Sequence, residues 1–245
     1  IGDLDGNGFG WNISMSSDGK RVASTGNIDD KNYVRVLEYD GSEWIQLGED
    51  ILGLYGFGLV LKISMDGKRL VIGYDYAYDK KILNIYEYNG TNWIDIGSIT
   101  LSQLNVTNVD LSEDGSILVI GTGHAYASNP SYVQVYEYNG SVWNELGGKI
   151  IGTSGKYFGN KVSISSDGKI ISALTQYEAI RVYEWDGSSW DQLGGEIEGG
   201  ISLSMSHDGT VVATHTKVLK WDGVSWNQLG SNFNSHDQIF VELSG

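Results

Sequence analysis

The chain has 245 residues, 40% of them hydrophobic and 11% aromatic, which supports a packed core, and it has no apolar run long enough to cross a bilayer. Its 16 basic and 31 acidic residues give a net charge of −15, which repels nucleic-acid phosphates and anionic lipid surfaces. Without cysteine, the chain has neither disulfides nor thiolate metal sites. We therefore expect no nucleic-acid partner and no membrane insertion.

An Asp-Gly turn recurs along the chain. Its five copies are Asp18-Gly19, Asp66-Gly67, Asp114-Gly115, Asp167-Gly168 and Asp208-Gly209. Successive copies lie about 41–53 residues apart, which is the length of a propeller blade and too long for a leucine-rich or ankyrin repeat. The spacing predicts a ring-type repeat protein built from β-strands.

A second motif keeps step with the first. Its copies are YDGSEW at 39–44, YNGTNW at 88–93, YNGSVW at 138–143, WDGSSW at 185–190 and WDGVSW at 221–226. Leu-Gly or Ile-Gly begins three residues after each tryptophan. Asp-Gly and Asn-Gly supply the positive φ angles of tight hairpins, so both motifs predict turns between strands.

In chain order the repeats cover about 1–50, 51–98, 99–150, 151–196 and 197–231. Each predicts four strands: A ends in SxDG, B follows the turn, C is the VRVLEY-type run, and D starts near the tryptophan. Apolar residues on both faces of the strands predict sheets that are covered on both sides. We predict an all-β fold, a β-propeller of five four-stranded blades, as a single domain over residues 1–245.

An extra strand is predicted in residues 232–245, where VELSG aligns with the SISSDG of strand A. It is either the strand that closes a five-bladed ring or the first strand of a sixth repeat. The missing initial methionine favours a piece of a longer array, and the five full repeats favour closure.

The SSDGK turn with its VRVYE-type strand resembles the WD-type propeller repeats. The pairs Phe9-Gly10, Phe57-Gly58 and Phe158-Gly159, placed just before strand A, resemble the FG-GAP repeats of surface proteins. The five repeats are also similar in number and size to tachylectin-type lectins. The FG-GAP resemblance implies a secreted or surface location and a role in adhesion or recognition, and it supplies no catalytic residue.

Candidate ligand-binding residues lie in the B–C loops, because these loops differ between repeats while the SxDG and C–D turns do not. Aromatic rings for stacking and polar partners are offered by Tyr74, Tyr76, Tyr78, His124, Tyr126 and Asn129. The alternative is that the tyrosines extend strand B and pack on its neighbours. The motif tryptophans likewise either bind sugar or pack the hairpin of each blade.

A candidate calcium loop is formed by Asp3, Asp5 and Asn7 in the pattern D-x-D-x-N-G. The alternative is a polar turn before strand A, because no other repeat has the pattern and no glutamate stands at the twelfth position. No other cofactor is expected. Glutamates in one strand C column, Glu38, Glu87, Glu137 and Glu184, predict a structural hydrogen-bonding position rather than a catalytic one.

These residues predict a non-enzymatic recognition or structural module of a secreted or surface protein. Its ligand would be a glycan or a protein, bound through the B–C and D–A loops. Two alternatives stay open: a glycoside-active enzyme that uses carboxylates, and a purely structural scaffold. The four arginines, Arg21, Arg35, Arg69 and Arg181, lie in strand positions rather than in one cluster, which disfavours a sialidase-like enzyme.

Overall fold

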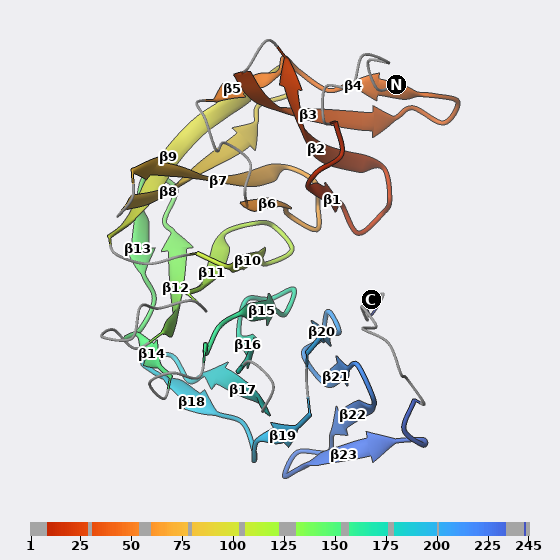
Figure 1. The fold of residues 1–245 in the computed structure, drawn as a ribbon, viewed down its shortest axis with the longest axis vertical. Coiled ribbons are helices and arrows are strands. Elements are labelled where there is room, and N and C mark those ends of the chain that lie inside the picture. The colour runs from red at the N-terminus through yellow and green to blue at the C-terminus, as the bar shows by residue number, and fades with distance from the viewer. Residues whose placement is uncertain are drawn as a thin grey trace. The chain divides into compact units, whose positions relative to one another are not determined.

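The computed structural model describes residues 9–28, 31–53, 60–77, 80–102, 106–122, 131–152, 157–175, 179–199, 201–233 and 243, with side chains left out at 28, 75–77, 80 and 102. The described residues form strands, turns and bends, and no helix occurs among them. The strands group into five antiparallel sheets (Figure 1), one for each predicted repeat. We number these sheets blades 1 to 5.

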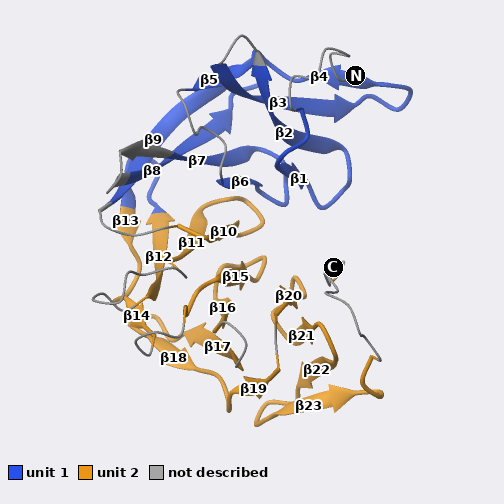
Figure 2. Cartoon of the chain, in the orientation of Figure 1, with its two compact units in different colours: residues 1–104, 138–143 blue, residues 105–137, 144–245 orange. Residues whose placement is uncertain are grey.

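The chain divides into two compact units (Figure 2). Unit 1 comprises Ile1–Leu104 and Tyr138–Trp143, and unit 2 comprises Asn105–Glu137 and Asn144–Gly245. The single domain predicted over residues 1–245 stays a prediction.

Unit 1 contains blades 1 and 2. Blade 1 consists of β1 (Ile13–Met15), β2 (Arg21–Ile28), β3 (Lys31–Tyr39), β4 (Trp44–Gln46) and β5 (Ile51–Gly53). Blade 2 consists of β6 (Val60–Ile63), β7 (Arg69–Ala77), β8 (Lys80–Tyr88) and β9 (Trp93–Ser102).

Blades 4 and 5 and most of blade 3 belong to unit 2. Blade 3 consists of β10 (Asn108–Leu111), β11 (Ile117–Gly121), β12 (Tyr132–Tyr138), β13 (Trp143–Glu145) and β14 (Ile150–Ile151). Blade 4 consists of β15 (Lys161–Ile164), β16 (Ile170–Leu174), β17 (Ala179–Trp185), β18 (Trp190–Gln192) and β19 (Ile197–Glu198). Blade 5 consists of β20 (Leu203–Met205), β21 (Val211–Thr214), β22 (Val218–Trp221) and β23 (Trp226–Leu229).

The predicted four-strand order A-B-C-D holds in every sheet, but strand D is broken in three of them. In blade 1, β4 and β5 both pair with β3, and blades 3 and 4 repeat this arrangement. The break falls at the Leu-Gly pair, where Gly48 has a φ of 76° that no regular strand contains. Blade 2 instead keeps one continuous strand, β9, with a register shift opposite Ile85 and Tyr86.

The hydrophobic core lies between successive blades within each unit. Val119 and Val135 of blade 3 pack in one cluster with Ile164 and Ile171 of blade 4, and all four side chains are at most 1% exposed. Every residue of β11 is buried, which is the pattern of a strand covered on both faces. Packing of sheet on sheet therefore explains why the strands are apolar on both sides.

Candidate functional site

Antiparallel pairing gives each blade two distinct edges. The SxDG turns and the C–D hairpins lie at one end of the strands, which we call the turn edge. The B–C and D–A connections lie at the opposite end, which we call the loop edge. Recognition is expected at the loop edge, where the sequence varies between repeats.

At the turn edge, each SxDG turn satisfies its own polar groups. The hydroxyl of Ser16 donates to Asp18 Oδ1 at 2.7 Å and accepts the Arg21 N–H at 2.9 Å. The same serine-to-aspartate bond recurs in the other four turns, at Ser64-Asp66, Ser112-Asp114, Ser165-Asp167 and Ser206-Asp208. The serine hydroxyl and a backbone N–H lower the pKa of Asp18 and of Asp208. These groups are engaged in the fold itself.

The glycines of these turns have the positive φ angles that the Asp-Gly pattern predicts. Gly19, Gly67 and Gly168 have φ values of 69°, 72° and 73°, which confirms the turn assignment. Their surroundings differ. A Cβ at Gly168 would lie 2.6 Å from Ile117 Cγ1 of blade 3, whereas a Cβ at Gly19 would meet none of the described residues within 4 Å.

The C–D hairpins repeat a second internal network. Asp40 Oδ1 accepts the backbone N–H groups of Ser42 and Glu43 at 2.7 and 2.9 Å. The same side-chain turn occurs at Asn89, Asn139, Asp186 and Asp222. Beside each turn two aromatic rings pack with centroids 5.2–5.5 Å apart, and the pairs are Tyr39-Trp44, Tyr88-Trp93, Tyr138-Trp143, Trp185-Trp190 and Trp221-Trp226.

Three of the motif tryptophans also join neighbouring blades. The indole N–H of Trp93 donates to the carbonyl of Leu47 at 3.0 Å, and Trp93 is 8% exposed. Trp190 and Trp226 donate in the same way to Leu146 and Leu193, each at 2.9 Å. A ring whose N–H is engaged by the preceding blade supports the packing interpretation over five equivalent sugar sites.

Trp143 departs from this pattern. Its indole nitrogen is buried and has no hydrogen-bond partner in the described part of the chain. The preceding repeat has Ile96-Gly97 in place of Leu-Gly, and Gly97 lies within β9 with a φ of 135°. Because the backbone at Gly97 differs from that at Gly48, the carbonyl of Ile96 does not accept the indole N–H of Trp143 as the carbonyl of Leu47 accepts that of Trp93.

The glutamate column is explained by register. Arg21 lies opposite Glu38 and Arg69 opposite Glu87, with ion-pair distances of 2.8 and 3.1 Å. The same guanidinium groups lie over Tyr88 and Tyr138, with centroid distances of 5.4 and 5.1 Å. Where strand B has isoleucine instead, at Ile117 and Ile170, the opposing glutamates Glu137 and Glu184 have no such arginine. The structural role predicted for the column is therefore confirmed at Glu38 and Glu87, and it stays a prediction at Glu137 and Glu184.

The other two arginines form ion pairs within their own blades, which the sequence analysis missed. Arg35 binds both carboxylate oxygens of Asp50 at 2.8 and 2.7 Å. Arg181 binds Glu196 at 2.7 Å. All four arginines of the chain are thus paired with a carboxylate, and none belongs to a cluster that could hold a substrate carboxylate.

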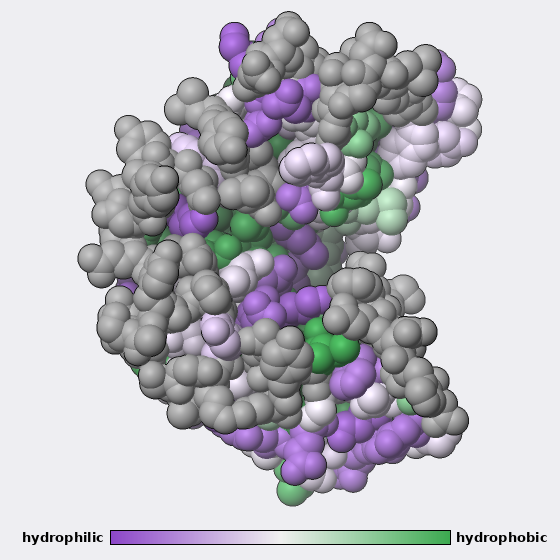
Figure 3. Space-filling view, in the orientation of Figure 1, coloured by the Kyte–Doolittle hydropathy of each residue, from purple (hydrophilic) through white to green (hydrophobic). Residues whose placement is uncertain are grey.

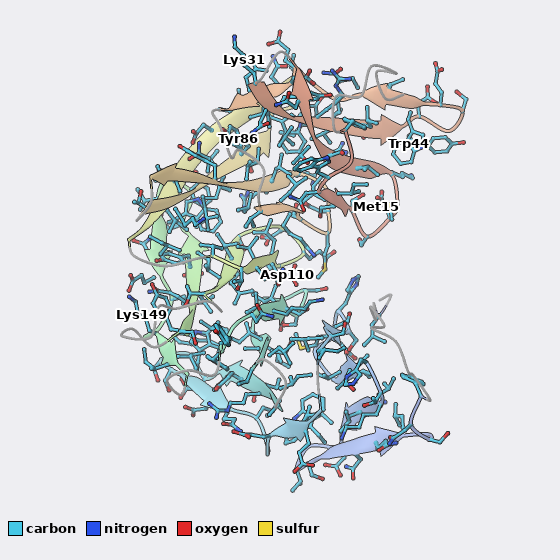
Figure 4. The ribbon with its side chains drawn as sticks, in the orientation of Figure 1. Met15, Lys31, Trp44, Tyr86, Asp110 and Lys149 are labelled. Atoms are coloured by element: carbon cyan, nitrogen blue, oxygen red, sulfur yellow. The ribbon has the colours of Figure 1, made fainter. Side chains whose placement is uncertain are left out.

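A buried carboxylate links blades 3 and 4. Asp110 on β10 is 6% exposed and accepts the Ile164 N–H at 3.1 Å and the Ser163 hydroxyl at 3.2 Å (Figure 4). Ser14 of blade 1 takes the same position and accepts the Ile63 N–H at 3.0 Å. These contacts position the first strands of successive blades. Their polar atoms are hydrogen-bonded within the fold.

Most of the predicted ligand-binding residues lie outside the described part of the chain. Tyr74 is partly buried and packs against the hydrophobic cluster of unit 1. Tyr76 lies on β7, and its side chain is outside the description. The other candidates outside the description are Tyr78, His124, Tyr126 and Asn129. The packing of Tyr74 fits the alternative in which the tyrosine belongs to the core.

The predicted calcium ligands Asp3, Asp5 and Asn7 are also outside the described residues. Within the described ranges, no group of three or more acidic or histidine side chains is placed to hold a metal ion. The same ranges contain no helix of the length and hydrophobicity that a membrane span needs.

The Phe-Gly pairs pack the loop edge wherever they are described. Phe158 is fully buried and meets Tyr183 edge-on with ring centroids 6.4 Å apart. Gly159, with a φ of 84°, donates its N–H to the backbone carbonyl of Leu174 at 3.0 Å. Gly10 donates its N–H to the backbone carbonyl of Thr25 at 2.9 Å. The motif therefore anchors the segment before strand A to strand B.

Comparison with known proteins identifies the fold and no family. No family model matches the sequence, and no curated protein matches it. A structure of a Lactobacillus plantarum protein is similar with a TM-score of 0.65 and 13% identity, over 90% of this chain and 70% of that one. The chain has a five-bladed β-propeller fold.

Two further structures are similar at the same identity. TolB from Acinetobacter baumannii matches with a TM-score of 0.55 and 13% identity, over 89% of this chain and 53% of its own, so this chain spans about half the length of TolB. A candidate 6-phosphogluconolactonase from Bacteroides uniformis matches with a TM-score of 0.56 and 13% identity, over 90% of this chain and 84% of its own. At this identity the likeness concerns the fold alone.

Proposed function

We propose that this propeller is a non-enzymatic recognition or structural module of a secreted or surface protein, akin to the FG-GAP and WD-type repeats, and that it binds glycan or protein through its loop edge. The observation that carries the proposal is the contrast between the edges. At the turn edge, the repeated serine, aspartate and tryptophan side chains form hydrogen bonds within the fold. The variable sequence lies in the loops, where binding residues of a rigid scaffold are usually found.

The loops offer the chemistry that a sugar or a polar protein surface requires. Tyr76, Tyr78 and Tyr126 supply flat rings for stacking, and His124 and Asn129 supply hydrogen-bonding groups. The described surface over blades 4 and 5, at the bottom of Figure 3, is mostly hydrophilic. An acidic, hydrophilic surface with local aromatic loops favours a neutral or basic ligand.

A glycan array probed with the full chain, with and without calcium, tests the proposal. We expect a group of related glycans to bind, and binding to weaken in Tyr126→Ala. The matched control is Val224→Ala, since Val224 is 82% exposed at a hairpin of the turn edge and its truncation leaves the loops unchanged. Binding that needs calcium and is lost in Asp3→Asn supports a metal loop at Asp3, Asp5 and Asn7.

Two results contradict the proposal. Release of a cleaved product from bound glycans indicates the alternative, a carboxylate-dependent glycoside-active enzyme. Absence of any glycan ligand, together with absence of a protein ligand in a pull-down from cell-surface extracts, indicates a purely structural scaffold.

A further inference from the structure

One contact recurs between successive blades and defines a socket. It consists of the Leu-Gly pair of one blade, against which the next blade places its motif tryptophan. The carbonyls of Leu47, Leu146 and Leu193 accept the indole N–H groups at 3.0, 2.9 and 2.9 Å. A Cβ built on the following glycines, Gly48, Gly147 and Gly194, would lie 3.2, 2.9 and 3.2 Å from Cδ1 of the same tryptophans.

Blade 5 carries the same socket in the same conformation. Gly230 has a φ of 70°, close to the 73–76° of the three occupied glycines. Gln228 donates to the Gly230 carbonyl at 3.1 Å, as Gln192 does to Gly194 at 3.1 Å. The backbone that receives a tryptophan elsewhere is therefore formed here as well.

Among the described residues of unit 2, none covers this socket of blade 5. A Cβ on Gly230 would meet nothing within 4 Å, and Leu229 is 48% exposed, whereas Leu47 is 7% exposed. Phe233 stands three positions after its glycine and is 44% exposed, whereas Ile197, three positions after Gly194, is 3% exposed. The equivalent side chains Leu47 in blade 1 and Ile197 in blade 4 are buried, and each packs in one cluster with side chains of the following blade.

A second contact shows what lies beside blade 5. The N–H of Leu243 donates to the Ser204 hydroxyl at 2.9 Å. Ser204 stands four residues before its turn aspartate, as Ser14 and Asp110 do, and those two accept the N–H groups of Ile63 and Ile164 in the first strand of the next blade. Leu243 thus makes the contact that strand A of a following blade makes.

We propose that Leu229, Gly230 and Phe233 form the docking surface for a sixth blade, whose first strand is the segment containing Leu243 and whose C–D hairpin inserts a tryptophan against Gly230. A second copy of the chain fits less well as the occupant. To place its Trp44 against Gly230, the second copy would also have to place its strand β1 beside Ser204, and Leu243 already occupies that position.

The test extends the chain so that the sixth blade is complete. Leu243 corresponds to Met205, so a copy of residues 207–233 is fused directly after Ser244, which corresponds to Ser206. We expect the extension to raise Tm by roughly 5 °C or more and to resist limited proteolysis, since a blade that binds only the folded state stabilises it. The same extension with the copied tryptophan replaced by alanine should lose most of the gain.

Leu229→Asp keeps the test decisive. In the unextended chain this exposed position should tolerate the change, and in the extended chain the change should abolish the gain. An extension that is cleaved rapidly and leaves Tm unchanged overturns the proposal. So does sedimentation of the unextended chain as an oligomer that Leu229→Asp dissociates, because the occupant would then be a second copy.

Discussion

Trp93 and Trp143 form a matched pair that isolates the hydrogen bond between blades. Each ring lies against a glycine of the preceding repeat, with Cδ1 3.2 Å from the place of a Cβ on Gly48 or Gly97. Only Trp93 donates its N–H, to Leu47 at 3.0 Å, while the buried Trp143 nitrogen has no partner among the described residues. Both tryptophans belong to unit 1.

Substitution by phenylalanine removes the N–H and a similar amount of ring at both positions. In Trp93→Phe the Leu47 carbonyl also loses its donor, and leaving a buried polar group without a partner costs about 1–3 kcal/mol. In Trp143→Phe an unsatisfied buried donor disappears, which offsets part of the packing loss. We therefore expect Trp93→Phe to lower the free energy of unfolding by about 1–3 kcal/mol more than Trp143→Phe does.

Urea unfolding of the two variants and the parent chain measures this difference. A shift of 1 kcal/mol corresponds to roughly 2–4 °C in Tm for a chain of this length, so thermal unfolding gives an independent reading. Equal losses in the two variants would refute the reasoning, because the ring packing alone would then account for the role of the tryptophan.

Further predictions concern the turn edge. Gly168→Val should lower Tm more than Gly19→Val, because both need a positive φ but only the first side chain collides with Ile117; equal shifts would contradict this. Asp208 accepts hydrogen bonds from Ser206 and Thr210, and these lower the pKa of its carboxyl group in the folded state. The ionised carboxylate therefore stabilises the fold at pH values above the unfolded pKa near 4. This stabilisation is lost as the pH falls from the unfolded pKa through the lower folded pKa. Asp208→Asn should therefore flatten the fall in stability between pH 5 and about pH 3, measured by urea unfolding, and an unchanged slope would contradict the assignment.

Repetition is why the fold could be predicted from sequence. Two turn motifs recur five times. Each copy needs a glycine with a positive φ and packs its tryptophan against a second aromatic ring, so the strand order follows from local chemistry. The break of strand D was not predicted, because Leu-Gly and Ile-Gly look alike in sequence while Gly48 and Gly97 differ in φ by almost 60° (76° and 135°).

Contacts between blades were harder to predict. Asp110 binds a backbone group 54 residues away, and its equivalents Ser14 and Ser204 share only the ability to accept a hydrogen bond. The ion pairs Arg35-Asp50 and Arg181-Glu196 share a separation of 15 residues, and this repeated spacing could have revealed them. The loop-edge candidates rest on side-chain chemistry and variability alone, since neither turn rules nor periodicity fixes where such side chains lie.

The binding of the loop-edge variant tests the central claim most directly. Tyr76 and Tyr126 are replaced together by alanine, and the affinity for the glycan or protein ligand is measured beside Tm, with Val224→Ala as the control. Loss of an aromatic contact at the centre of an interface costs on the order of 1–3 kcal/mol, so we expect affinity to fall roughly tenfold or more while Tm stays unchanged. Unchanged affinity would contradict recognition through these tyrosines. A loss of binding that accompanies loss of folding would also contradict it, because it would indicate that the tyrosines pack in the core of the blades.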